Sequence, residues 1–338
     1  MAHYYVRRLG QAVMTVFGVI VASFFLIKNM PGGPVDYLIA QLADSRDQSI
    51  SPEVVREMSV EYLLVDPNDP VWIQFLDYFT SILQGNFGQS FWYQESVSGL
   101  IARALPWTIF YAVIALVLSF GIGIVLGSLM GYFEGTKFDA AATLVSQTIV
   151  AVPYYIIALV LVFVFAFNLS LFPTGGNKPI GVEAGFTFEF LSSILYHATL
   201  PIASLVIARF GFTALSMRGN SVRVLGSDYI RVARLRGLSE RRIALLYVGR
   251  NAILPLWTGL MIGIGTLFGG SVILEKIFSY PGIGWYILQA LNARDMPLLM
   301  GSFIVVTIAI VVGLLVADLT YGLIDPRVKQ GGDQHEAY

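Results

Sequence analysis

Long apolar segments alternate with short polar ones along the chain. Six of the apolar segments approach the length of about 20 residues that a helix needs to cross the hydrocarbon core of a bilayer. They are Leu9–Ile27, Trp107–Phe133, Ala140 to about Phe167, Leu200 to about Met217, Leu256–Leu274 and Ser302–Leu323. The fourth contains Arg209 and the sixth contains Asp318. The pattern predicts an all-α membrane protein with six transmembrane helices.

The first apolar segment has a second interpretation. Arg7 and Arg8 before an apolar run are also typical of a removable signal peptide. No small-x-small cleavage site lies between this run and the helix breaker Pro31-Gly32-Gly33-Pro34. The sequence therefore favours an uncleaved helix.

A long segment, 31–106, separates the first two apolar segments. Within Val71–Leu83, apolar residues recur at helical spacing, which predicts an interfacial amphipathic helix or a small lid on the outer mouth. A short helix is expected near Pro52–Glu61. The chain thus divides into 1–30 with the first helix, an extracytoplasmic segment 31–106, a core 107–323 that includes a cytoplasmic loop 218–255, and a tail 324–338.

The composition supports this class. Hydrophobic residues make up 56% of the 338 residues, charged residues 13%, and the mean hydropathy is +0.71. These values exclude a disordered chain, a nucleic-acid-binding arm and a disulfide-stapled module. Cysteine is absent and the three histidines lie far apart in the sequence, so no metal site and no catalytic residue is expected.

Basic residues predict the orientation of the spans. With a cytoplasmic N-terminus, the inside segments 1–8, 134–139, 209–255 and 324–338 carry 14 Lys and Arg. The outside segments 31–106, 168–199 and 275–301 carry 6. We therefore expect a multi-pass protein of the cell (plasma or inner) membrane with both termini in the cytoplasm.

Eight arginines and no lysine lie in one stretch, Arg218–Arg250. Ser227 or Asp228 can cap a short helix that Gly237 ends, and Ser239 can cap a second helix from Glu240 to Asn251. The spacing places Tyr229, Val232, Ala233 and Arg236 near one face of the first helix. Such a loop binds lipid phosphates or docks a protein, and the preference for arginine, which binds carboxylates bidentately, favours docking.

The segment Asp228–Arg242, followed by Arg250-Asn251-Ala252-x-Leu254-Pro255, resembles the EAA loop of ABC importer permeases. It is most similar to the dipeptide, oligopeptide and nickel branch, although Arg231-Val232-Ala233 replaces the general Glu-Ala-Ala. Other similar motifs, in chain order, are Pro31–Pro34 with Gly33 as a departure, Gly85–Ser90, Leu105-Pro106-x-Thr108, Glu275–Gly284, Arg294-Asp295-x-Pro297 and Asp325-Pro326-Arg327. The resemblance covers nearly the whole chain and fits the first permease of a pair best.

This resemblance implies a type I ABC importer permease fold with a long outer segment after helix 1. It implies a second homologous permease, two ABC ATPase subunits that hold ATP and Mg, and an extracytoplasmic substrate-binding protein. This chain lacks a Gly-x-x-x-x-Gly-Lys-Ser/Thr run, so no cofactor is expected in it. In the family the first helix of the loop couples to the ATPase; the matching residues here are Asp228, Tyr229, Arg231, Ala233, Arg234, Gly237, Leu238, Ser239 and Glu240. The implied cargo is di- or oligopeptides, with oligosaccharides or nickel chelates as the alternative.

Other residues are assigned less specific roles. Gly259, Gly263 and Gly269 in the fifth segment either pack closely against another helix or line the pathway. The same two roles are open for Asp318 in the sixth segment. Arg209 and Asp318 could form an intramembrane pair. On the outer side, Glu275, Arg294 and Asp295 either brace a loop or contact the binding protein.

Two further function classes fit the sequence less well. A secondary transporter or channel requires buried carboxylates or broken helices near the midplane, and Asp318 is the one acid inside the six segments. A membrane-embedded protease requires a Ser/His or Asp/Asp pair within the spans; Gly-x-Ser-x-Gly and a second intramembrane Asp are both absent. The sequence therefore predicts a transport subunit that is not itself an enzyme.

Overall fold

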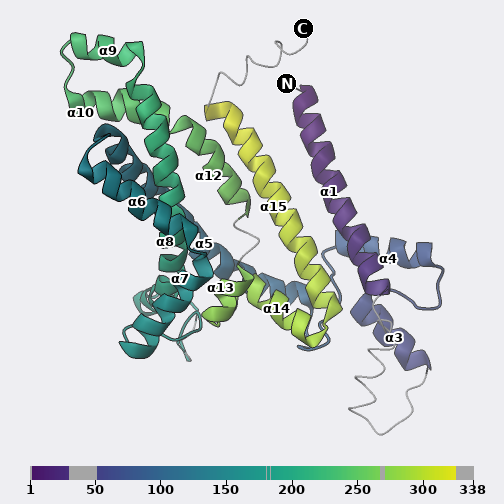
Figure 1. Cartoon of the computed structure of the whole chain (residues 1–338). Coiled ribbons are helices and arrows are strands. Elements are labelled where there is room, and N and C mark those ends of the chain that lie inside the picture. The colour runs from purple at the N-terminus through teal and green to yellow at the C-terminus, as the bar shows by residue number, and fades with distance from the viewer. Residues whose placement is uncertain (1, 30–51, 180, 183, 267–270, 325–338) are drawn as a thin grey trace. The chain divides into compact units, whose positions relative to one another are not determined.

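The computed structural model describes residues 2–29, 52–179, 181–182, 184–266 and 271–324, and these ranges are mostly helical (Figure 1). The helices are α1 (Ala2–Lys28), α3 (Pro52–Leu63), α4 (Val71–Leu83), α5 (Val97–Tyr132), α6 (Lys137–Ala151), α7 (Tyr154–Leu161), η1 (Val162–Asn168), α8 (Phe188–Leu225), α9 (Asp228–Leu235), α10 (Glu240–Arg242), η2 (Ile243–Gly249), α11 (Arg250–Ala252), α12 (Leu254–Thr266), α13 (Val272–Ile277), α14 (Ile283–Ala293) and α15 (Met296–Ile324). The chain forms two compact units. Unit one comprises Met1–Thr108, Phe268–Lys276 and Pro281–Leu315, and unit two the remainder.

Four of the described helices are long and apolar enough to cross a membrane: α1, α5, α8 and α15. The pair formed by α6 with α7 and η1 also qualifies if it is counted as one bent span. The predicted fifth span begins as α12 but continues into residues 267–270, which lie outside the described residues. The described part thus accounts for up to five of the six predicted spans, and the count of six stays a prediction.

The third apolar segment is not one straight helix. It breaks between Ala151 and Tyr154, where the two halves meet at 94°. Pro153 lacks a backbone N–H, and its ring drives the preceding residue out of the helical region. Val152 accordingly has an extended backbone, with φ −90° and ψ 121°. The apolar pattern predicts one continuous helix from Ala140 to about Phe167, and this prediction is wrong at Pro153.

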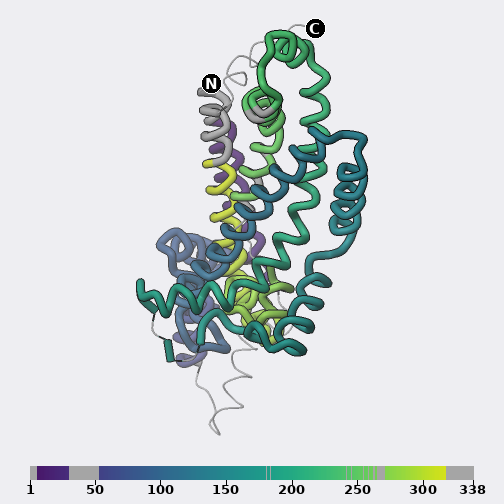
Figure 2. Tube along the Cα trace, turned by 90° about the vertical axis from the view of Figure 1, so that its left-hand side faces the viewer, coloured from purple at the N-terminus to yellow at the C-terminus, as the bar shows by residue number. Residues whose placement is uncertain are grey.

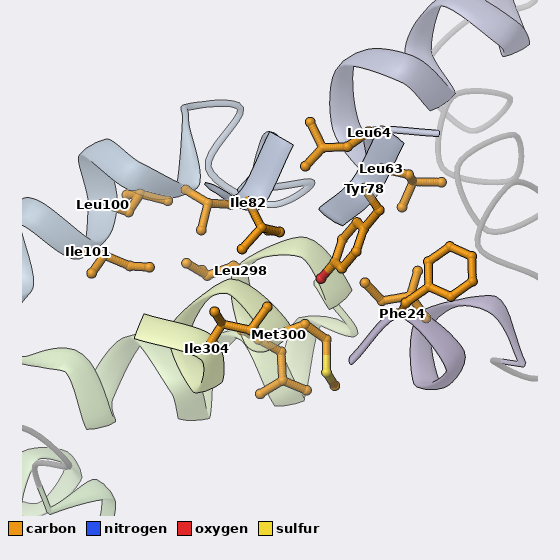
Figure 3. Close-up of a cluster of buried hydrophobic side chains, with 14 of the residues drawn as sticks. Phe24, Leu63, Leu64, Tyr78, Ile82, Leu100, Ile101, Leu298, Met300 and Ile304 are labelled. Atoms are coloured by element: carbon orange, nitrogen blue, oxygen red, sulfur yellow. The ribbon is translucent and has the colours of Figure 1, made fainter. Parts of the chain in front are cut away.

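Unit one is held by a hydrophobic cluster that joins helices distant in sequence (Figure 3). The labelled side chains in Figure 3 come from α1, α3 and the residue that follows it, Leu64, and from α4, α5 and α15, and they point into one core. On α4, Gln74, Tyr78 and Ile82 are buried. Lys28 Nζ donates a hydrogen bond to Gln74 Oε1 at 2.8 Å, which ties the end of α1 to α4. The predicted helix Val71–Leu83 is confirmed, and its place at the membrane interface stays a prediction.

Unit two is built on α8. Figure 2 shows α6 running beside α8, and both α6 and α7 pack against it. Three glycines spaced four residues apart on α5, Gly123, Gly127 and Gly131, face α8. A β-carbon built at Gly127 would lie 2.3 Å from the Ala214 carbonyl oxygen, so a side chain there would force the two helices apart. Small residues at this spacing let helix backbones approach closely in a membrane.

Candidate functional site

The arginine-rich loop folds into two short helices at one end of α8 (Figure 1). Ser227 has the extended backbone of an N-cap residue, and Asp228 occupies the first turn, where its charge complements the helix dipole. The Ser227 hydroxyl, however, donates to the Val224 carbonyl at 2.5 Å and does not cap α9. The predicted start of the helix is therefore confirmed, whereas the predicted side-chain cap is not formed.

Gly237 ends α9 in the way the sequence predicts. Its φ is +71°, in the left-handed region that favours glycine. The Gly237 N–H donates to the Arg234 carbonyl at 2.9 Å, and the Leu238 N–H donates to the Ala233 carbonyl at 3.3 Å. This pair of bonds is a Schellman motif, which satisfies carbonyls left over at a helix end. The chain then turns through Ser239, which has the extended backbone of an N-cap residue, into the next helix at Glu240. The predicted start of this helix is confirmed, but the Ser239 side chain forms no cap hydrogen bond.

The two faces of α9 differ sharply. Ile230 and Ala233 are buried in a small cluster with Ile243 and Val248. The opposite side exposes apolar side chains: Tyr229 is 43% exposed, Val232 52% and Leu235 81%. Ala233 was expected on the face of Tyr229 and Val232, but it lies at the edge of that face and turns into the cluster.

Charged side chains surround the exposed face of α9. Arg231, Arg234 and Arg236 are all exposed. Arg234 Nε donates to Glu240 Oε1 at 3.2 Å, which links α9 to α10. The result is a helix with an apolar strip, framed by arginines, that the described residues leave uncovered.

An ion pair anchors the loop's supporting helix. Arg218 on α8 donates through Nε and a terminal nitrogen to the two oxygens of Asp139, at 2.5 and 2.8 Å. Asp139 is 3% exposed and also accepts from the Gly135 N–H at 3.0 Å. The turn before α6 is thus fixed to the end of α8 from which the loop emerges. The sequence had placed Arg218 only in the general basic patch.

Two buried carboxylates brace unit one. Glu275 on α13 is fully buried; its Oε1 accepts from Thr108 Oγ1 at 2.9 Å, and its Oε2 accepts from the Trp285 N–H at 2.8 Å. The Thr108 oxygen accepts in turn from the Ile283 N–H at 2.8 Å. Gly282 is required here, because a β-carbon built at this position would lie 2.4 Å from Thr108 Oγ1.

Asp295 makes an equivalent brace before α15. It is fully buried and accepts from Ser90 Oγ at 2.5 Å and from the N–H groups of Trp92 and Leu298 at 3.1 Å. Arg294 beside it is exposed and adopts a left-handed backbone with φ 55°. Of the two roles left open by the sequence, the geometry gives loop bracing to Glu275 and Asp295 and leaves Arg294 on the surface.

The two described glycines of the fifth segment differ in how closely they are packed. A β-carbon built at Gly263 would lie 2.9 Å from Leu116 Cδ1, so this glycine allows close packing of α12 against α5. At Gly259 no described atom lies within 4 Å of such a carbon. Both glycines line a cavity of about 370 Å³, together with Arg209. Gly269 and the side chain of Asp318 lie outside the described part, so the predicted Arg209–Asp318 pair is not tested.

Sequence reasoning missed several partners of these residues. Thr136, whose hydroxyl accepts from the Asp139 N–H at 3.3 Å, forms with Asp139 a Thr-x-x-Asp pattern that signals a helix start. The four-residue spacing of Gly123, Gly127 and Gly131 is likewise visible in the sequence. No local pattern pairs Ser90 with Asp295, because 205 residues separate them.

The fold and the loop define a multi-pass helical membrane protein that carries a folded, arginine-rich surface loop. Residues 123–330 match the family described as binding-protein-dependent transport system inner membrane component, and the chain belongs to that family. It is therefore a membrane-spanning permease subunit of an ABC importer, a type that works with a partner permease, ATPase subunits and a substrate-binding protein. The subunit is not itself an enzyme, because the ATPase activity resides in partner subunits.

Individual relatives extend over nearly the whole chain. The chain is 33% identical to the oligopeptide transport system permease protein AppB of Bacillus subtilis, over 97% of this chain and 100% of that protein. It is 32% identical to the oligopeptide transport system permease protein OppB of Haemophilus influenzae, over 96% of this chain and 98% of that protein. A solved inward-facing structure of the MetNI methionine ABC transporter is similar in fold, with a TM-score of 0.53 and 14% identity, covering 67% of this chain and 96% of that one. The predicted type I permease fold is confirmed.

Proposed function

We propose that this permease subunit imports di- or oligopeptides and that α9 is the helix through which it couples to an ATPase. It would form half of the translocation pathway, with a second homologous permease forming the other half. An extracytoplasmic binding protein would deliver the peptide, and two ATPase subunits would bind on the opposite side. Both termini would lie in the cytoplasm, on the side of the loop.

The exposed apolar strip of α9 carries the coupling part of the proposal. A helix of eight residues, rich in arginine, gains nothing in water by exposing Tyr229, Val232 and Leu235. The strip is rigidly presented, since Ile230 and Ala233 anchor the other face and the Schellman motif fixes the end. Aromatic and arginine side chains together are typical of protein interfaces, where they anchor a partner. A groove on an ATPase subunit fits this surface.

The relatives support the choice of peptides as cargo. AppB and OppB are both named as oligopeptide permeases, and they align with this chain almost from end to end. A dipeptide permease of Bacillus subtilis, DppB, is 30% identical over 97% of this chain. Similarity over the whole length includes the membrane core, through which cargo passes, as well as the loop.

Charged substitutions on the strip test the coupling proposal. The chain is co-expressed with its partner permease and the ATPase subunits, carrying Leu235→Glu or Val232→Glu. Loss of an apolar anchor at an interface costs about 2 kcal/mol or more, or about 30-fold in affinity, so the ATPase should no longer co-purify. Leu246→Glu is the matched control, because Leu246 is an exposed apolar residue of η2 in the same loop. Retention of the ATPase and of ATP-driven peptide uptake by both α9 variants would refute the proposal.

A further inference from the structure

A cavity lies in unit two between α5, α8 and α12. Its volume is about 370 Å³, within the range of small-molecule sites in proteins. Most of its lining is apolar, including Phe120, Phe212 and Leu260. Among the described residues that line it, Arg209 is the one charged side chain and none is acidic. The cavity therefore presents one positive group in apolar surroundings.

Arg209 differs from Arg218, which lies further along α8. Arg218 is held by both oxygens of Asp139, whereas Arg209 is exposed and has no hydrogen bond or ion pair within the described part of the chain. Thr213, one helical turn further along α8, lines the same cavity and carries a hydroxyl group. Gly259 on α12 contributes no side chain, which leaves room opposite them.

The depth of Arg209 in the membrane makes its charge costly unless it faces water, a partner or a ligand. Arg218 is tied to the turn at Gly135, which joins two membrane helices and so marks one face of the bilayer. Arg209 lies nine residues earlier on α8, about 13 Å along the axis. A hydrocarbon core about 30 Å thick places it near the middle. Charged residues at such depth face water-filled cavities or partners and mark substrate pathways.

We propose that Arg209 binds the C-terminal carboxylate of a peptide as it passes through this cavity. This inference rests on the proposed function as a peptide permease. The guanidinium offers two parallel N–H donors that match a carboxylate, and the Thr213 hydroxyl offers a third donor. Partial exposure suits a transit site, because binding there must be weak enough for release. Arg209 thus selects for the anionic end of the cargo.

The test measures uptake by the complete transporter in proteoliposomes. The cargo is the dipeptide Ala-Phe or its C-terminal amide, each at a concentration that saturates the binding protein. Arg209→Gln should lower the maximal uptake rate of Ala-Phe about tenfold or more and that of the amide less than about twofold, because the amide lacks the charge that Arg209 binds. Arg209→Lys should retain a larger share of Ala-Phe uptake. Arg223→Gln, which removes an exposed arginine from the same helix outside the cavity, should leave both rates unchanged.

A thiol variant provides a second readout on an assembled complex. The chain has no cysteine, so Arg209→Cys introduces a single reactive site into this subunit. A methanethiosulfonate reagent that attaches an aminoethyl group should restore Ala-Phe uptake, and one that attaches a sulfonatoethyl group should not. The wild-type complex treated with each reagent is the control for thiols on partner subunits.

The outcomes separate the two proposals. If the wild-type complex does not take up Ala-Phe, the proposed function fails and the carboxylate site fails with it. If the wild type takes up Ala-Phe but Arg209→Gln stays within about twofold, the carboxylate site alone is overturned. Equal losses for the dipeptide and its amide, or rescue by either reagent regardless of charge, also overturn it, since Arg209 would then support the fold or bind a partner subunit.

Discussion

Gly237 ends the proposed coupling helix, α9, and replacing it measures how much its left-handed backbone stabilises that end of the helix. A residue with a β-carbon in the left-handed region costs about 1–2 kcal/mol. No described atom lies within 4 Å of a β-carbon built at Gly237, so Gly237→Ala adds backbone strain without a clash. The strain should weaken the bonds from Gly237 and Leu238 to the last carbonyls of α9. Asparagine tolerates this conformation better, so Gly237→Asn should cost less.

Hydrogen–deuterium exchange of the α9 amides measures this effect directly. A cost of about 1–2 kcal/mol corresponds to local opening that is about 5- to 30-fold more frequent, so exchange over α9 should accelerate by that factor. Gly226→Ala is the matched control, because Gly226 has φ −76° and the nearest atom to a β-carbon there is 3.7 Å away. Equal exchange rates for Gly237→Ala and Gly226→Ala would refute the role assigned to the left-handed turn.

Two further predictions concern unit two. Asp139→Asn or Arg218→Gln should each destabilise the complex by about 2 kcal/mol, because each single variant leaves the other side chain of the pair without its partner. The double variant should be little less stable than either single variant. Additive shifts in melting temperature would contradict a direct pair. Gly127→Val should abolish assembly of the permease in size-exclusion chromatography, since its side chain would meet the Ala214 carbonyl oxygen, whereas Gly121→Val, with no described atom within 4 Å of its β-carbon, should be tolerated. Normal assembly of Gly127→Val would show that α5 and α8 do not pack through this glycine.

Local patterns in the sequence predict the loop well. Gly237 and Ser239 mark the end of α9 and the start of the next helix because the signals for helix ends depend on residues within a few positions of each other, although the Ser239 side chain forms no cap hydrogen bond. Helix α4 has the predicted bounds for a similar reason, since its apolar residues repeat at helical spacing. These features need no information about the rest of the chain.

Contacts between distant segments are not predictable in the same way. Glu275 and Asp295 could equally have faced a binding protein, and only the positions of Thr108 and Ser90 in space make them internal braces. The cavity around Arg209 arises because three helices meet there, and hydropathy registers Arg209 only as an interruption. The break at Pro153 could have been predicted from the sequence, because proline ends helices. Hydropathy alone does not show it, because the residues on both sides are apolar.

The central claim is that α9 contacts an ATPase subunit, and site-specific cross-linking tests it most directly. Because the chain has no cysteine, Leu235→Cys carries a benzophenone maleimide at one defined place on the exposed strip, and Leu83→Cys, on the exposed side of α4, is the control. Irradiation of the assembled transporter should cross-link position 235 to an ATPase subunit, with a yield that changes when ATP binds. Cross-linking from position 235 to lipid or to the partner permease alone, or an equal ATPase yield from position 83, would contradict the account.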